Sequence, residues 1–107
     1  MFFIQPKRPP TAEPLIDELT MRMTSALRNA RVPAYQFLGV HACICGAVSD
    51  STNRILANGA VTNTLCVHYL AYHRPEVPAA ELDAVRRLPG DGDVPSPEEL
   101  DGTAGRP

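Results

Sequence analysis

The sequence is poor in aromatic residues and has no tryptophan. Phenylalanine and tyrosine contribute three residues each to a chain of 107. A chain of this length forms at most one domain, and with so few aromatic side chains its apolar core is modest. Small domains with modest cores commonly gain stability from a disulfide or a bound metal. Cysteine and histidine are the residues that would form such a disulfide or bind such a metal.

Long hydrophobic runs are also absent. No stretch approaches the roughly 18 apolar residues that a membrane-spanning helix needs. The first residues are apolar but lack the positively charged start and long apolar region of a secretory signal peptide. We therefore expect a cytoplasmic protein with no membrane association. In a reducing cytoplasm disulfides are rare, and closely spaced cysteines more often bind metal or take part in redox chemistry.

The chain has no concentration of charge of one sign. Its net charge is −2, and its basic residues are scattered rather than clustered on one segment. A nucleic-acid-binding protein is expected to present a clustered basic face, so the charge pattern argues against a nucleic-acid partner.

Catalytic motifs are missing as well. The sequence contains no phosphate-binding glycine loop, and neither the H-E-x-x-H motif of zinc proteases nor the H-x-E motif of zinc deaminases. These absences disfavour an enzyme. A small zinc-dependent hydrolase or deaminase-like enzyme, with Glu76 or Asp50 approaching the metal, stays open as an alternative.

Composition divides the chain into three parts. Residues 1–10 contain three prolines and are predicted to form an extended arm. Residues 89–107 are rich in proline, glycine and acidic residues, which is typical of a disordered tail. Residues 11–88 carry the periodic patterns of a single folded domain.

Helical periodicity marks three segments of that domain. The first covers residues 14–30, with Thr11 as its capping residue and Pro33 after its end. Two further helices are predicted at residues 62–74 and 78–88, the first of them also ended by a proline.

A β-rich segment lies between the first two helices. Residues 35–48 are rich in β-branched, aromatic and cysteine residues and are predicted to form a strand or hairpin arm. The pair Asn58-Gly59 is a strong signal for a tight turn. With the helices, this hairpin predicts a small α+β fold.

All cysteines and histidines of the chain lie between residues 41 and 73. Zinc binds four cysteine or histidine side chains in a tetrahedron, often two from a turn and two from a helix. The sequence therefore predicts one zinc ion per chain, held by a preferred set of ligands: Cys43, Cys45, His68 and His73.

The spacing within each pair sets a geometric requirement. His68 and His73 are five residues apart, which places them about 140° apart on an ideal helix. They converge on one metal only if the last helical turn loosens, and the following Arg74-Pro75 favours this. Cys43 and Cys45 converge only through a tight turn, which Gly46 permits.

Two further residues are ambiguous as ligands. His41 shares the strand face of Cys43 and could replace one of the cysteines. Cys66 lies among leucines and is interpreted first as a small buried apolar residue. A cysteine–histidine iron–sulfur cluster is a minor alternative to zinc. A redox pair of Cys43 and Cys45 is weaker still, because such motifs have two intervening residues.

The order of strand, cysteine turn, hairpin and helix with two histidines resembles a ββα zinc finger over residues 35–74. The 22 residues between Cys45 and His68 exceed the usual spacer of a finger. The helix positions that would contact DNA in a finger carry no arginine or lysine. The resemblance implies a zinc site, and it leaves a finger-like nucleic-acid regulator as a further alternative.

Together these patterns favour a structural zinc in a non-enzymatic accessory or interaction protein. Its apolar helix face over residues 14–30, proline-rich arm and acidic tail suit a protein partner or a second copy of the chain.

Overall fold

A computed structural model describes residues 4–32, 42–49 and 53–102 of the chain. The described residues form an α+β fold with four α-helices, one 3₁₀ turn and one antiparallel hairpin, which confirms the predicted class. In chain order the elements are α1 (Glu18–Arg28), β1 (Arg54–Ile55), β2 (Val61–Thr62), α2 (Leu65–Tyr72), η1 (Arg74–Glu76), α3 (Ala79–Arg86) and α4 (Pro97–Leu100). None of the described helices is long and apolar enough to cross a membrane.

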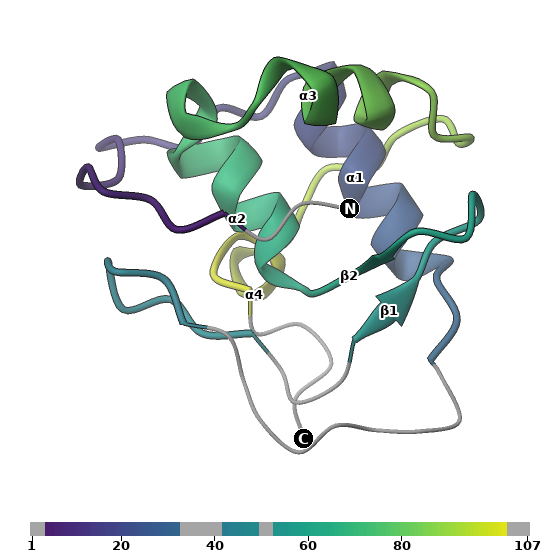
Figure 1. The fold of residues 1–107 in the computed structure, drawn as a ribbon, viewed down its shortest axis with the longest axis horizontal. Coiled ribbons are helices and arrows are strands. Elements are labelled where there is room, and N and C mark those ends of the chain that lie inside the picture. The colour runs from purple at the N-terminus through teal and green to yellow at the C-terminus, as the bar shows by residue number, and fades with distance from the viewer. Residues whose placement is uncertain (1–3, 33–41, 50–52, 103–107) are drawn as a thin grey trace.

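Helix α2 lies at the centre of the molecule (Figure 1). Seven of its eight residues are buried, because it is apolar on nearly every face and is covered on several sides. Helices α1 and α4 both pack against α2, and α3 packs against α1. The buried core includes Met23, Leu56, Leu70 and Val85.

Helix α1 begins later than the sequence predicted. Its first residue is Glu18, and Asp17 is the capping residue, since the Asp17 carboxylate accepts a hydrogen bond from the backbone N–H of Thr20. The same carboxylate accepts two hydrogen bonds from the Arg74 guanidinium, at 2.7 and 2.8 Å. This ion pair joins the start of α1 to η1, the turn that follows α2.

The segment before α1 runs beside α2 instead of forming a helical turn. The backbone N–H groups of Thr11 and Leu15 donate to the carbonyl oxygens of Tyr72 and Ala71. Thr11 is therefore not a helix cap. These bonds satisfy carbonyl groups at the C-terminal end of α2, which have no partner within the helix.

Strands β1 and β2 form a hairpin around the predicted turn. Arg54 pairs with Thr62, and Ile55 pairs with Val61. Gly59 has a φ of 83°, a conformation that glycine adopts without steric cost. Half of the predicted β-rich arm, residues 35–41, lies outside the described residues, and its described half, residues 42–48, forms a separate turn.

Residues 89–102, which the sequence predicted to belong to a disordered tail, form hydrogen bonds with the rest of the described chain. Asp93 donates its backbone N–H to the Met21 carbonyl, and Glu99 forms two hydrogen bonds with Arg28, at 2.6 and 2.8 Å. Ser96 caps α4 in a reciprocal pair of hydrogen bonds with Glu99. Glu99, one of the acidic residues that suggested disorder, thus pairs with Arg28 and takes part in capping the start of α4. Residues 103–107 lie outside the described part.

Candidate metal centre

A tight turn presents the two cysteines. The backbone N–H of Cys43 donates to the Ala47 carbonyl at 2.7 Å, and that of Gly46 donates to the Cys43 carbonyl at 2.9 Å. Gly46 has a φ of 100°, so the turn depends on the freedom that Gly46 was predicted to supply. Between the cysteines, Ile44 is 70% exposed, which shows that its side chain faces away from the protein.

Helix α2 and the residue after it present the two histidines. His68 lies within the helix, whereas the helix ends at Tyr72 and His73 has φ −128° and ψ 30°. This departure from helical geometry is the loosening that the five-residue spacing required. Pro75 follows within η1, where it prevents α2 from continuing.

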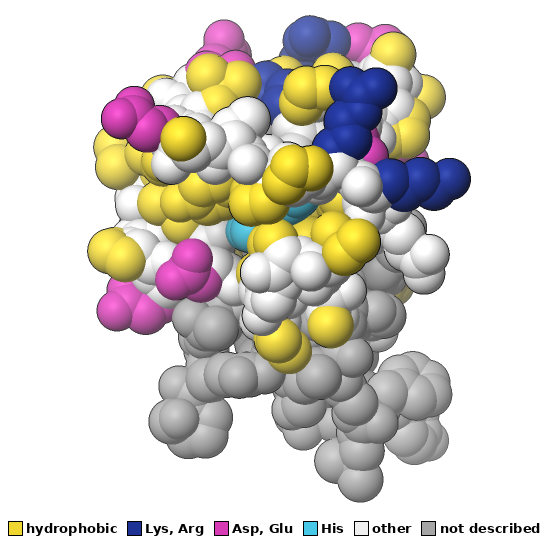
Figure 2. All heavy atoms as spheres, turned by 90° about the vertical axis from the view of Figure 1, so that its left-hand side faces the viewer, with side chains coloured by type: hydrophobic (Ala, Val, Ile, Leu, Met, Phe, Trp, Pro, Cys, Tyr) yellow, Lys and Arg dark blue, Asp and Glu magenta, His cyan; other side chains and the backbone are white. Residues whose placement is uncertain are grey.

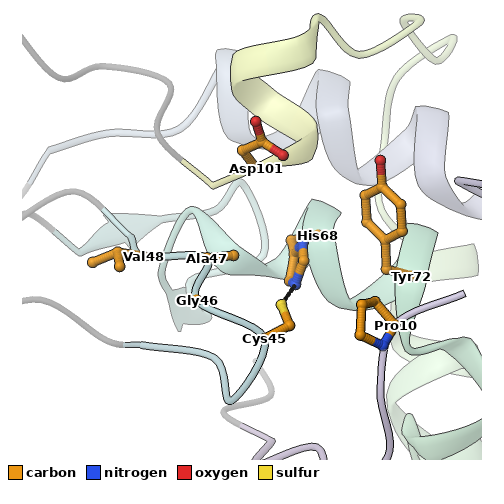
Figure 3. A pocket seen from close by; sticks show the side chains of 8 residues that line it. All are labelled: Pro10, Cys45, Gly46, Ala47, Val48, His68, Tyr72 and Asp101. Carbon is orange, nitrogen blue, oxygen red and sulfur yellow. Dashed lines mark hydrogen bonds between the residues drawn. The ribbon is translucent and has the colours of Figure 1, made fainter. Parts of the chain in front are cut away.

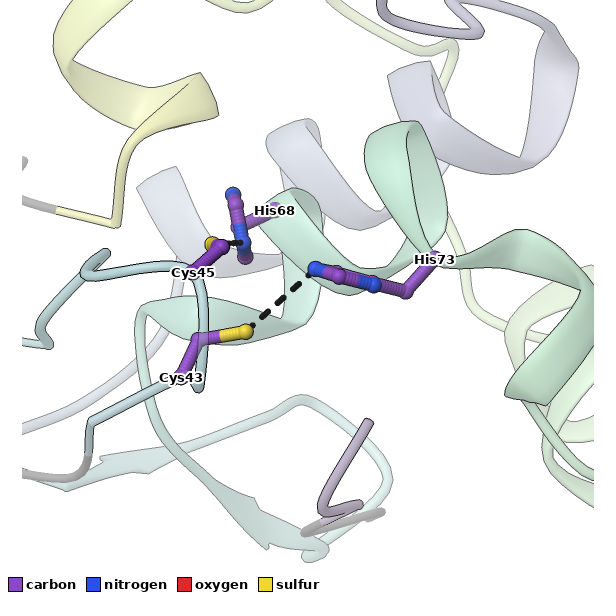
Figure 4. A group of neighbouring side chains, drawn as sticks. All are labelled: Cys43, Cys45, His68 and His73. Carbon is purple, nitrogen blue, oxygen red and sulfur yellow. Dashed lines mark hydrogen bonds between the residues drawn. The ribbon is translucent and has the colours of Figure 1, made fainter. Parts of the chain in front are cut away.

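The four side chains converge on one point (Figure 4). Their donor atoms all lie within 4.8 Å of one another. Cys45 Sγ is 3.1 Å from His68 Nε2, and Cys43 Sγ is 3.3 Å from His73 Nε2. Zn–S bonds of about 2.3 Å and Zn–N bonds of about 2.0 Å imply edges of roughly 3.3–3.8 Å in a tetrahedral site. The observed group needs only small shifts to reach that size.

Burial sets the protonation of the group. Cys43, His68 and His73 are 4%, 3% and 2% exposed, whereas Cys45 is exposed. Burial raises the pKa of the Cys43 thiol and lowers the pKa of both histidines. The histidines are therefore neutral at physiological pH, the form in which imidazole binds metal. A metal would replace the thiol protons.

The outer nitrogen of His68 has a partner from the C-terminal segment. His68 Nδ1 lies 3.1 Å from the carbonyl oxygen of Leu100, which can only accept a hydrogen bond. The proton of the neutral ring therefore sits on Nδ1, and the lone pair on Nε2 faces the cysteine sulfurs. Such outer partners orient histidine ligands in metal sites.

The outer nitrogen of His73 faces Glu76. Its Nδ1 is buried without a hydrogen-bond partner among the described residues, and Glu76 Oε2 is 3.7 Å away. Glu76 Oε1 accepts a hydrogen bond of 2.8 Å from the backbone N–H of Lys7. That hydrogen bond is the main reason why the pKa of Glu76 is lowered. Glu76 thus links the N-terminal arm to His73.

Sequence reasoning missed these outer partners. Leu100 contributes only a backbone oxygen and lies in a segment predicted to be disordered. Glu76 was considered only as a residue that could approach the metal in the enzymatic alternative. The separation of three residues between His73 and Glu76 was the available signal, because such pairs can meet at the end of a helix.

The remaining candidate residues lie elsewhere or outside the described part. Cys66 is fully buried in the core and contacts the hydroxyl of Thr62. Burial raises the pKa of the Cys66 thiol to about 11. His41 and Asp50 lie outside the described residues.

The cysteine turn, the hairpin and the helix with the histidines follow one another in the order that the sequence predicted. The cysteines lie on their own turn, and the β1–β2 hairpin falls between that turn and α2 in the chain. No family model matches the chain, and no curated protein or solved structure matches it. The function of the group is therefore argued from its geometry and chemistry.

Proposed function

We propose that this protein binds one zinc ion through Cys43, Cys45, His68 and His73, and that the ion has a structural role. The observation that carries the proposal is the approach of two sulfur and two nitrogen donors to within 4.8 Å of one another. They come from two segments that are more than 20 residues apart in the chain.

The donor set favours zinc over other metals. Thiolate and imidazole together suit zinc, whereas magnesium and calcium prefer oxygen ligands. Two sulfurs and two nitrogens also complete a four-coordinate site, so no position is left for a reacting water. A site that is full with protein ligands is typical of a structural metal.

Charge balance supports the same assignment. Two thiolates and two neutral imidazoles carry a charge of −2, which one divalent cation cancels. Burying a charge without a partner is costly, and the metal-bound group is neutral as a whole. Without the metal, the raised pKa of Cys43 keeps that thiol protonated.

The position of the group explains what the metal would stabilise. The cysteine turn is joined to α2 at the site, and α2 is the centre of the core. Zinc-finger peptides gain about 10–16 kcal/mol of apparent free energy from the metal. A whole domain is stable by only about 5–15 kcal/mol, so zinc would decide whether this region folds.

The contacts of Glu76 support a role outside catalysis. A zinc hydrolase needs a general base beside an open metal position. Glu76 instead faces the outer nitrogen of His73 and accepts a hydrogen bond from Lys7. We therefore infer an accessory or interaction protein that acts through a protein partner or a second copy of the chain.

Elemental analysis of the purified protein tests the proposal. We expect about one zinc per chain, lost in Cys43→Ser, His68→Ala and His73→Ala together with cooperative unfolding. Cys66→Ala is the matched control, because it removes a buried cysteine that lies outside the group, and it should keep the zinc. A folded, metal-free wild-type protein would contradict the proposal.

The cobalt-substituted protein separates a structural from a catalytic site. A closed site predicts tetrahedral absorption bands that do not change when anions are added. Anion-sensitive bands would reveal an exchangeable position and would favour the enzymatic alternative.

A further inference from the structure

A cavity of about 500 Å³ lies directly beside the metal-binding group. Its walls come from four parts of the chain, namely Pro10, residues 45–48 of the cysteine turn, His68 and Tyr72 of α2, and Asp101 after α4 (Figure 3). In this view the sulfur of Cys45 and a ring nitrogen of His68 point toward each other. We call it the Asp101 cavity.

Asp101 is the single formally charged residue in this lining. Asp101 is exposed, and among the described residues its carboxylate forms no ion pair or hydrogen bond, while its backbone N–H donates to the carbonyl oxygens of Pro97 and Glu99. The zinc-bound cysteine and histidine group would be neutral, so no described residue in the lining compensates the charge of Asp101. The cavity therefore attracts a cation.

The other walls of the cavity are mostly apolar. Pro10, Val48 and the ring of Tyr72 supply carbon surface to the cavity. Figure 3 shows Tyr72 and Pro10 on the side of His68 away from Val48. An aromatic ring favours a cation above its face, and an apolar wall favours the methylene groups of a long side chain.

The face of the molecule drawn in Figure 2 carries charged side chains of both signs. Figure 2 shows histidine atoms between hydrophobic side chains, with acidic side chains at the lower left and Lys and Arg, with further acidic side chains among them, toward the upper right. A positively charged group approaching the acidic side meets attraction on the surface as well as inside the cavity.

We propose that the Asp101 cavity binds the side chain of a lysine or arginine from a partner protein. The ammonium or guanidinium group pairs with the Asp101 carboxylate, and the methylene stem packs against Tyr72 and Pro10. The inference extends the proposed function, since the zinc would hold Cys45 and His68, two of the walls, in place. It names the chemistry by which a protein partner is recognised.

The test uses the zinc-loaded full chain and a small probe, N-acetyl-lysine methylamide. The amide signals of residues 45–48, Tyr72 and Asp101 are followed by NMR during titration. We expect saturable shifts at these residues and binding that is weaker by roughly fivefold in Asp101→Asn, as for a partly exposed ion pair. Glu98→Gln is the matched control, because it removes an acidic charge nearby that does not line the cavity.

A second probe isolates the role of charge. The norleucine analogue has the same length without the ammonium group and should bind at least about fivefold more weakly. Equal binding of the two probes, or equal binding by wild type and Asp101→Asn, would overturn the proposal. Binding seen only in Arg106→Ala would assign the cavity to the chain's own arginine and would also overturn it.

Zinc content measured on the same sample separates the two proposals. A zinc-loaded protein that binds neither probe refutes the lysine site and leaves the zinc proposal intact. Selective lysine binding by a protein that holds no zinc supports the cavity and refutes the structural metal.

Discussion

The carbonyl oxygen of Leu100 lies 3.1 Å from Nδ1 of His68. A residue of the C-terminal segment thereby orients a side chain of the central helix α2. The segment is held in place by a second contact nearby, in which Thr64 Oγ1 donates to the Gly102 carbonyl at 2.6 Å. Metal binding and docking of this segment are expected to depend on each other.

A substitution at Gly102 tests this dependence. Gly102 has a φ of 79°, and a Cβ atom there would lie 2.6 Å from Leu65 Cδ2. Gly102→Ala should displace the segment, lower the free energy of unfolding by about 1–3 kcal/mol and weaken zinc binding. Chemical denaturation and competition with a zinc chelator measure both effects.

Gly59→Ala is the matched control for that prediction. Gly59 also has a positive φ, 83°, but nothing lies within 4 Å of an added Cβ. Its variant carries the backbone strain without the overlap, so it should lose about 1 kcal/mol and keep its zinc affinity. Equal loss of zinc affinity in both variants would refute a specific role for the C-terminal segment.

Glu76 is predicted to support zinc binding through His73. Its Oε2 is 3.7 Å from the buried Nδ1 of His73. Glu76→Gln should weaken zinc affinity by about tenfold, the lower end of the effect seen when an outer partner of a histidine ligand is lost. Chelator competition measures the change. Glu13→Gln, an exposed acidic residue near the same arm, should bind zinc like the wild type.

The ion pair of Asp17 and Arg74 is predicted to make stability depend on pH. Hydrogen bonds from Arg74 lower the pKa of Asp17 from 3.8 to about 2. A lowered carboxyl pKa contributes stability that is complete above the unfolded value and is lost as pH falls toward 2. Asp17 is partly exposed, so the contribution near neutral pH is about 1 kcal/mol after solvent screening.

Asp17→Asn isolates this ion pair, because asparagine also caps helices. The unfolding free energies of wild type and variant are measured with urea at each pH. Their difference is free of the pH dependence of the metal site, because both proteins contain the same site. The difference in unfolding free energy should be largest above pH 5 and shrink as pH falls below 4. A difference that stays constant with pH would assign the effect to something other than the ion pair.

The sequence predicted the parts of the structure that depend on local patterns. Clustering of cysteine and histidine identified the four residues that the structure brings together. The Asn58-Gly59 turn and the end of α2 before Pro75 follow from backbone chemistry that a few residues determine. These features can be predicted without knowing which distant residues are in contact in the fold.

The parts that the sequence did not predict depend on distant contacts. The start of α1 moved from Thr11 to Asp17 because Arg74, 57 residues away, pairs with Asp17. Residues 89–102 are packed because Arg28 and the central helix supply partners that composition alone does not reveal. Backbone oxygens such as that of Leu100 carry no sequence signal at all.

X-ray absorption at the zinc edge of the purified, zinc-loaded protein tests the central claim most directly. The account predicts a four-coordinate site with two sulfur neighbours at about 2.3 Å and two nitrogen neighbours at about 2.0 Å. A shell with a different number of sulfurs, or with oxygen from water in place of a histidine, would contradict the ligand set Cys43, Cys45, His68 and His73.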